Sequence, residues 1–163
     1  MTAVEIRPAG PEDRAALIRF MARLQDFERE IEPNRRPGDA MAEAHMAALL
    51  AWVAAAGGGC LVAEELDGAG AVGFVLFGVE TEIGDYVLPE NRRVGRISDL
   101  WVEPGARGQG VARRLLQAAE EALAALGICR VEVSALPDNR RARAFYEAAG
   151  FSPALLTLAK RIA

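Results

Sequence analysis

Histidine and cysteine are scarce in this chain of 163 residues, and their scarcity excludes some kinds of site. One histidine and two cysteines, Cys60 and Cys129, cannot supply the four ligands of an ordinary structural zinc site. Both cysteines lie in apolar runs, which predicts small buried thiols rather than reactive nucleophiles. We therefore expect no metal site, and a reduced, cytoplasmic location.

Long apolar runs and an excess of basic residues are also missing. The longest apolar stretch, residues 46–56, is too short to span a bilayer, and no basic segment leads an apolar one at Met1. Lysine and arginine number 19 against 23 acidic residues, a net charge of −4, which argues against a dedicated nucleic-acid binder. The expectation is a soluble protein without a secretory signal that binds neither membrane nor nucleic acid.

The composition is that of a globular protein, with 52% hydrophobic and 26% charged residues, and the length predicts one domain over 1–163. The charges are unevenly distributed. Residues 1–90 carry 7 basic and 16 acidic side chains, and residues 91–163 carry 12 and 7. This asymmetry suggests an anionic ligand near the second half and a cationic one near the first, unless the charges mix on the folded surface.

The hydrophobic periodicity predicts one mixed α/β domain with the element order β-α-α-β-β-β-α-β-α-β. The second helix is expected to be capped by Asp39 and to bury a stripe of Met41, Ala48, Leu49, Trp52 and Val53, and a hairpin turn is expected at Asp67-Gly68. The predicted helices span 12–31, 39–56, 111–126 and 140–149. The predicted strands span 4–7, 60–63, 71–79, 96–102, 128–135 and 155–158.

The sharpest local signal is the segment Arg107-Gly108-Gln109-Gly110-Val111-Ala112, between a predicted strand and an amphipathic helix. Glycines let the backbone approach a ligand, and free N–H groups at a helix start bind phosphate. The segment is not a P-loop, because Val111 follows Gly110 where lysine is needed, and it lacks the third glycine of a dinucleotide fingerprint. A ligand-free turn is the alternative reading.

Two segments resemble the GNAT superfamily of N-acetyltransferases. The pattern Arg/Gln-x-x-Gly-x-Gly/Ala is met by Arg107, Gly110 and Ala112, and the second family motif is similar to 139–151. The resemblance covers nearly the whole chain. It implies a mixed sheet with helices on both faces and strands splayed around an acyl-CoA site.

The resemblance also implies roles for individual residues. Acetyl-CoA is the expected cosubstrate, with its pantetheine arm along Leu100, Trp101 and Val102 and near Asn139. Its pyrophosphate is expected on the N–H groups of Arg107, Gly108, Gln109, Gly110, Val111 and Ala112. Four arginines could meet further phosphate charge, about half of them in practice: Arg113, Arg114, Arg141 and Arg143.

Tyr146 is the expected catalytic residue by the same resemblance, and it would protonate the leaving thiolate. The general base is left open. The position that the family often uses falls on Ser98, expected on the same strand face as Arg96, and Asp99, Glu80, Glu82 or a water are alternatives. Because no strong base stands at Ser98, the sequence predicts activity that still rises above pH 8.

The leading functional hypothesis is acetyl transfer from acetyl-CoA to a small-molecule or peptide primary amine in a ternary complex. A non-catalytic acyl-CoA-binding regulatory module and a plain structural domain are the alternatives. Since only twelve residues follow Phe151, the usual final hairpin is shortened or completed by a partner chain, and a homodimer is possible.

Overall fold

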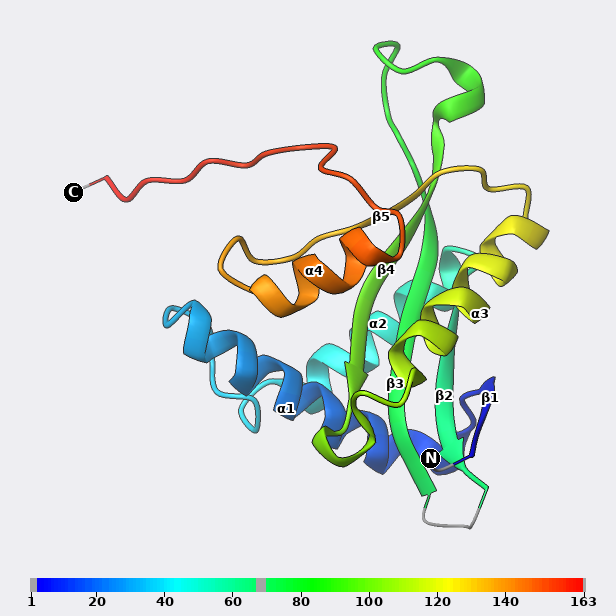
Figure 1. Cartoon of the computed structure of the whole chain (residues 1–163). Helices are drawn as coiled ribbons and strands as arrows, with labels where there is room; N and C mark the ends of the chain where they lie inside the picture. Colours follow the sequence, from blue (N-terminus) through cyan, green and yellow to red (C-terminus); the bar gives the residue numbers. More distant parts are fainter. Residues whose placement is uncertain (1–2, 67–69, 163) are drawn as a thin grey trace.

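The computed structural model describes residues 3–66 and 70–162, and five strands form a mixed sheet in the order β1-β2-β3-β4-β5 (Figure 1). The first three pairings are antiparallel, and β4 and β5 are parallel. The strands are β1 (Val4–Pro8), β2 (Gly59–Glu65), β3 (Gly70–Thr81), β4 (Arg93–Val102) and β5 (Val131–Val133). The predicted mixed sheet is confirmed.

Four α-helices accompany these strands in the described residues: α1 (Arg14–Ile31), α2 (Ala42–Ala55), α3 (Val111–Ala125) and α4 (Arg140–Ala148). Short 3₁₀ turns precede α1, β4 and the glycine loop: η1 (Pro11–Asp13), η2 (Pro89–Asn91) and η3 (Pro104–Ala106).

Apolar side chains cover both faces of the sheet. On one face, Phe20 of α1 and Met46 of α2 pack with Phe74 and Trp101. On the other face, α3 packs against the strand side chains that point the opposite way, including Val75 and Ile97. Helices on both faces, as predicted, follow from this alternation, because successive strand side chains point to opposite sides.

Strand β3 is the centre of the sheet and is buried on both faces from Gly73 to Gly78. A Cβ atom at Gly78 would lie only 2.7 Å from the ring of Trp52 in α2. The missing side chain therefore lets α2 pack close to the sheet.

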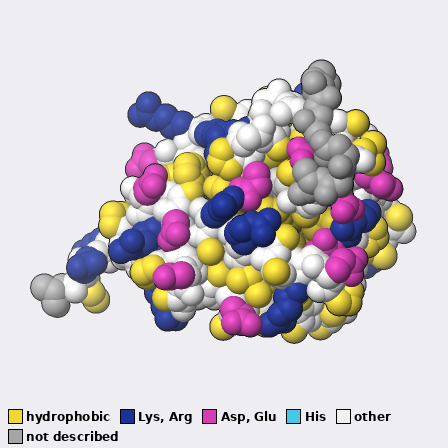
Figure 2. Space-filling model, turned by 90° about the horizontal axis from the view of Figure 1, so that it is seen from below, with side chains coloured by type: hydrophobic (Ala, Val, Ile, Leu, Met, Phe, Trp, Pro, Cys, Tyr) yellow, Lys and Arg dark blue, Asp and Glu magenta, His cyan; other side chains and the backbone are white. Residues whose placement is uncertain are grey.

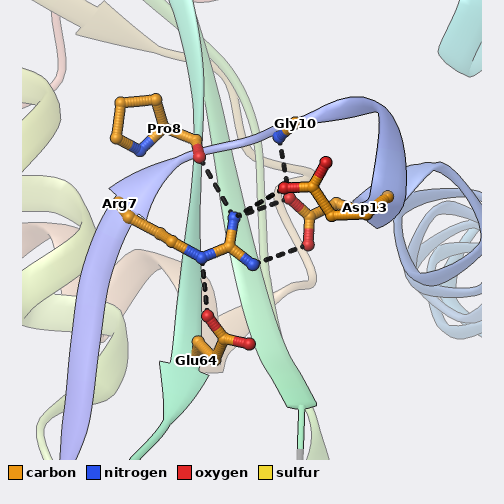
Figure 3. Close-up of polar contacts among 6 residues, drawn as sticks. Arg7, Pro8, Gly10, Asp13 and Glu64 are labelled. Atoms are coloured by element: carbon orange, nitrogen blue, oxygen red, sulfur yellow. Dashed lines mark hydrogen bonds and ion pairs between the residues drawn. The ribbon is translucent and has the colours of Figure 1, made fainter.

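A network around Arg7 ties the first strand to its neighbours (Figure 3). Arg7 donates to Asp13 of η1 at 2.7 and 3.0 Å and to Glu64 of β2 at 2.6 Å. Asp13, which is 5% exposed, also accepts from the N–H of Gly10 at 2.8 Å. These bonds fix the entry of the chain into α1.

Several local predictions are wrong. Asp39 does not cap α2, because Met41 precedes the helix and no side chain caps it. Ala48 is exposed and Met46 is buried instead. The strand predicted at 128–135 shrinks to β5. The turn predicted at Asp67-Gly68 lies outside the described residues.

The strand predicted at 155–158 is also absent. Residues 152–162 leave α4 as an extended segment that stretches away from the sheet (Figure 1). Leu155 is 89% exposed, and Leu156 and Leu158 are exposed as well. A sequence with strand propensity forms no strand here because no described strand lies beside it to pair with.

Candidate functional site

The site begins where β4 and β5 separate. The two strands pair only from Gly95 to Ile97 of β4, whereas β4 continues to Val102. The later part of β4 therefore has a free edge on the side of β5. A pocket of about 360 Å³ lies there, bordered by α1, the loop after β4, the start of α3, and α4.

Ten of the eleven residues predicted for the site line this pocket. They are Leu100, Trp101, Val102, Arg107, Gly108, Gly110, Val111, Ala112, Asn139 and Tyr146. Gln109 is outside the lining, and its side-chain amide donates to the Gly105 carbonyl at 3.1 Å. The fold thus brings together residues from two motifs about thirty positions apart.

The glycine loop has the backbone that the sequence predicts. Gly108 and Gly110 have φ angles of +76° and +80°, a left-handed region that residues with a Cβ rarely adopt. A Cβ at either position would meet no atom within 4 Å, so both glycines face open space. Gly110 immediately precedes α3, whose first N–H groups have no partner within the helix. The loop can therefore receive an anion.

Arg107 holds this loop to the end of β4. Its Nε donates to the Val102 carbonyl at 2.7 Å, and its guanidinium lies 4.4 Å from the centroid of the Trp101 ring. Burial and the nearby charge of Arg141 both lower the pKa of Arg107. Two guanidinium groups of like charge beside one pocket favour an anionic ligand.

The four arginines proposed for further phosphate charge lie in different settings. Arg113 and Arg141 line the pocket. Arg143 instead lies 4.0 Å from Glu147 and donates to the Pro137 carbonyl, and Arg114 is exposed outside the lining. Figure 2, which views the molecule from the end where β4 finishes, shows basic and acidic side chains interspersed over this face. The charges that are unevenly distributed along the sequence are therefore mixed on this face of the folded chain.

Asn139 and Tyr146 come from the N-cap and the interior of α4. Asn139 is 7% exposed and accepts from the Ala142 N–H at 3.0 Å, so its oxygen caps the helix. The ring of Tyr146 packs edge-on against Phe145 and Phe151. Burial, with the charges of Asp99 and Glu28, raises the pKa of Tyr146 to about 12. A phenol held in this state is a proton donor at neutral pH.

A β-bulge in β4 changes the face assignment made from the sequence. Asp99 pairs with Leu76, but the next pair is Ile97 with Phe77, so Ser98 is an extra residue. Because of this extra residue, Asp99 lies on the strand face of Arg96 and Trp101. Leu76 belongs to the cluster under α1 and α2, so Asp99 faces those helices.

The four side chains proposed as the base are found in different settings. Ser98 Oγ donates to Asp99 Oδ2 at 2.6 Å. Glu80 is paired with Arg96 at 3.1 Å, and Glu82 accepts from the Tyr86 hydroxyl at 2.7 Å in the segment between β3 and β4. Burial raises the pKa of Asp99, while Ser98 and the charges of His45 and Arg35 oppose the rise.

Sequence reasoning missed the contribution of α1 and the segment after it. Leu24 and Phe27 line the pocket, although their spacing predicts only a core stripe. Glu28, one residue further, pairs with Arg35 at 2.8 Å, and burial raises the pKa of Glu28. No motif marks these residues, because only the packing of α1 on β4 brings them to the site.

The prediction that both cysteines are buried is half right. Cys60 is buried and its pKa is raised to about 12, chiefly by burial, whereas Cys129 is exposed. Neither lines the pocket. In residues 3–66 and 70–162 no group of three His, Cys, Asp or Glu side chains is arranged to hold a metal ion. No described helix is long and apolar enough to cross a bilayer.

Comparison with known proteins adds to this geometry. The model of the acetyltransferase (GNAT) family matches residues 21–151. A mycothiol acetyltransferase of Beutenbergia cavernae is 48% identical over 59 residues, which is 36% of this chain and 20% of that enzyme. The match therefore spans about a fifth of the length of that curated relative.

Solved structures share the fold over almost the whole chain. A variant of the BH1408 protein of Bacillus halodurans superposes with a TM-score of 0.83 at 18% identity, covering 98% of this chain and 99% of that one. A GCN5-related N-acetyltransferase of Ralstonia eutropha gives a TM-score of 0.75 at 24% identity, covering 98% and 99%. At these identities the likeness establishes the fold.

Proposed function

Because this chain belongs to the acetyltransferase (GNAT) family, whose members take the acetyl group from acetyl-CoA, we propose that it acetylates a primary amine by direct attack in a ternary complex. One observation carries the proposal. A single pocket runs from the glycine loop, along the free edge of β4, to the hydroxyl-bearing ring of Tyr146. That path offers an anion site, a strand edge and a proton donor in turn.

The residues fit acetyl-CoA by their chemistry. The backbone from Arg107 to Ala112 offers N–H groups to the pyrophosphate, and Arg113 and Arg141 supply positive charge. The free edge from Leu100 to Val102 offers main-chain donors and acceptors to the two amides of the pantetheine arm, as in strand addition. Acetyl-CoA supplies the activated thioester.

Tyr146 then protonates the sulfur that leaves. Its raised pKa, about 12, keeps the proton on the phenol until a thiolate forms beside it. A free thiol has a pKa near 8.5, so the thiolate is a weaker base than a phenolate and the transfer must be concerted with bond breaking. The half-buried, edge-on contacts of its ring with Phe145 and Phe151 hold the hydroxyl in place.

Direct attack is favoured over a covalent acetyl-cysteine. The thiol of Cys60 is buried and its pKa of about 12 leaves almost no thiolate at neutral pH. Cys129 is exposed but lies outside the pocket lining. The acceptor amine must therefore reach the thioester itself.

We propose a small primary amine, an amino-acid derivative or a peptide amino terminus as the acceptor. The half-buried carboxyl groups of Glu28 and Asp99, whose charges act on Tyr146, favour a cation over an anion. Salt screens such an attraction, so kcat/KM for a cationic amine should fall as salt increases. We further propose that residues 1–163 form a single domain and that the protein is cytoplasmic.

We also propose that the protein forms a homodimer through its last residues. Strand β5 is the last strand of the described sheet, and the extended segment 152–162 exposes Leu155, Leu156, Leu158 and Ile162. Such apolar side chains gain free energy when a second copy covers them. Sedimentation of the full chain, with and without residues 152–163, tests the dimer.

The experiment that tests the function is a thiol-release assay with acetyl-CoA and a panel of amines at two salt concentrations. We expect turnover with a cationic primary amine and a lower kcat/KM at the higher salt concentration. The alternative, a regulatory module that binds acyl-CoA, predicts a thermal shift with acetyl-CoA and no thiol release with any amine. A best substrate that is anionic and indifferent to salt would contradict the proposed acceptor class.

A further inference from the structure

The exposed large apolar side chains of residues 3–66 and 70–162 are concentrated in two segments. One is the hairpin tip, residues 82–91 between β3 and β4, and the other is the C-terminal segment, residues 152–162. Seven of the nine such side chains lie there: Ile83, Tyr86, Leu88, Leu155, Leu156, Leu158 and Ile162. The other two, Leu66 and Leu126, stand singly after β2 and after α3. Single exposed apolar residues are ordinary, whereas grouped ones mark an interaction surface.

The hairpin tip is held in shape by its own polar groups, and it stands beyond the rest of the sheet (Figure 1). Arg92 at its base pairs with Asp85 at 2.8 Å, and the Arg92 carbonyl accepts from the N–H of Glu82 at 2.8 Å. The Tyr86 hydroxyl donates to Glu82 at 2.7 Å. Ile83, by contrast, is 91% exposed. An apolar surface that is already ordered loses little conformational entropy when a partner covers it.

The C-terminal segment has no comparable support in its own chain. It forms neither helix nor strand, and Figure 1 shows it leading away from the hairpin tip of the same chain. Eleven residues of extended chain span about 36 Å. The segment is therefore long enough to reach a second molecule.

The two segments carry opposite charges. The hairpin tip holds three acidic side chains and no basic one, whereas residues 152–163 hold Lys160 and Arg161 and no acidic one. Glu90 of the hairpin tip takes part in no ion pair among the described residues, and neither do these two cations. Opposite charges on two surfaces favour their association and fix how they align.

We propose that the hairpin tip of one copy binds the C-terminal segment of a second copy, with apolar side chains in contact and Lys160 of the partner subunit beside Glu90. This inference rests on the homodimer of the proposed function, and it names the surface that the last residues cover. Each copy has one hairpin tip and one C-terminal segment, so a twofold dimer forms two identical contacts and closes without further copies. Both sets of apolar side chains then leave the water, which stabilises the dimer.

Lys160 is the only lysine of the chain, so this contact can be detected directly by chemical crosslinking. A water-soluble carbodiimide joins an amine to a carboxylate as an amide, with the loss of one water. We expect it to join Lys160 to Glu90 in a mixture of ¹⁵N-labelled and unlabelled full-length protein. Mass spectrometry should find crosslinked peptides with one labelled and one unlabelled member. Crosslinks that form only within one chain would overturn the proposal.

Polar substitutions test the apolar part of the contact. Ile83→Ser and Leu88→Ser should each raise the dissociation constant of the dimer at least about tenfold in sedimentation experiments. Both side chains are exposed, so circular dichroism should show the wild-type fold. Leu66→Ser is the control, because Leu66 is 64% exposed and lies outside both segments. This control should dimerise as wild type does.

Charge reversal tests the polar part of the contact. Lys160→Glu should weaken the dimer, because a negative charge would then lie beside Glu90. Adding Glu90→Lys to the same chain reverses both members of the pair and should restore the dimer. A double variant no tighter than Lys160→Glu alone would overturn the pairing of these two residues.

The outcomes also separate this inference from the proposed function. A dimer that keeps its dissociation constant in Ile83→Ser and Leu88→Ser overturns the hairpin tip as the docking surface, while the homodimer itself stands. A wild-type protein that stays monomeric overturns both the homodimer and this contact. Acetyl transfer is measured independently, by thiol release.

Discussion

The guanidinium of Arg107 lies over the indole ring of Trp101 while its Nε donates to the carbonyl of the next residue, Val102. The arginine of the first motif is thus bound to the strand that precedes the loop. The stacking and the hydrogen bond together fix where the glycine loop starts. Arg107 therefore positions the backbone N–H groups that follow it.

Replacing Arg107 by lysine should weaken acetyl-CoA binding about tenfold, or about 1.4 kcal/mol. Lysine keeps the charge but has neither the Nε–H donor nor the planar group that stacks on Trp101. Isothermal titration calorimetry measures the change. Arg114→Lys, at an exposed arginine outside the pocket, is the control. If the two variants bound acetyl-CoA with equal affinity, Arg107 would contribute only its charge to binding.

Replacing Gly110 by glutamate should abolish the thermal shift caused by acetyl-CoA. The left-handed φ of +80° strains any residue with a Cβ, and a negative side chain at the start of α3 would occupy the space in front of its N–H groups. Gly105→Glu places the same side chain in the same loop outside the pocket and should retain the shift. A retained shift in Gly110→Glu contradicts the pyrophosphate site.

Replacing Tyr146 by phenylalanine should lower kcat about 100- to 10,000-fold, the usual scale for a general acid. The ring still packs against Phe145 and Phe151, so the thermal shift with acetyl-CoA should survive. Tyr86→Phe is the matched control, because Tyr86 is 77% exposed in the segment between β3 and β4. Similar kcat values for the two variants would make Tyr146 a core residue.

Replacing Asp13 by asparagine should lower the free energy of unfolding by about 2 kcal/mol at pH 7, because Arg7 loses its buried partner. The hydrogen bond from Arg7 holds the pKa of Asp13 below its usual value. The stabilisation is therefore present above the unfolded pKa of about 3.9 and is lost as the pH falls through the lower, folded value.

Urea denaturation between pH 3 and 7 measures this effect. The difference between wild type and Asp13→Asn should shrink toward the acid end of the range. Glu12→Gln is the control, because Glu12 is exposed and lies 3.8 Å from Arg7, and surface pairs contribute little. A difference that does not change with pH would mean that Asp13 acts through packing rather than through its charge.

Alkylation should distinguish the two cysteines. Iodoacetamide at pH 8 should modify the exposed Cys129 and leave Cys60, with its pKa of about 12, unmodified until the protein unfolds. Mass spectrometry of peptides identifies the modified residue. Acetyl transfer should continue after alkylation of Cys129, and loss of activity would point to a thiol on the reaction path.

The parts of the site that follow the chain locally could be predicted from sequence. The glycine loop and α4 are set by residues next to one another, and Gly110, Asn139 and Tyr146 all line the pocket. The orientation of Asp99 could not be predicted, because the bulge depends on the register between β3 and β4. Leu24 and Phe27 reach the pocket only through the packing of α1.

The C-terminal strand was predicted wrongly for a related reason. Residues 155–158 have strand-forming side chains, but strand structure needs a neighbour, and the described sheet ends at β5. The buried setting of Cys60 was predicted correctly, since its strand is covered by α1 and α2. The exposure of Cys129 was missed because the strand after α3 begins later than its apolar sequence suggests.

The order of strands in the sheet has a consequence for how the molecule folds. Strands β2, β3 and β4 are consecutive in the chain and pair as antiparallel neighbours, so they can assemble through short loop closures. Strand β5 pairs with β4 in parallel, and this pairing must wait until α3 has formed. The free edge of β4 therefore forms early in folding, and the part of the site built from the chain after α3 forms late. Under the proposed function acetyl-CoA binds only the assembled site, so it should slow unfolding more than it speeds folding.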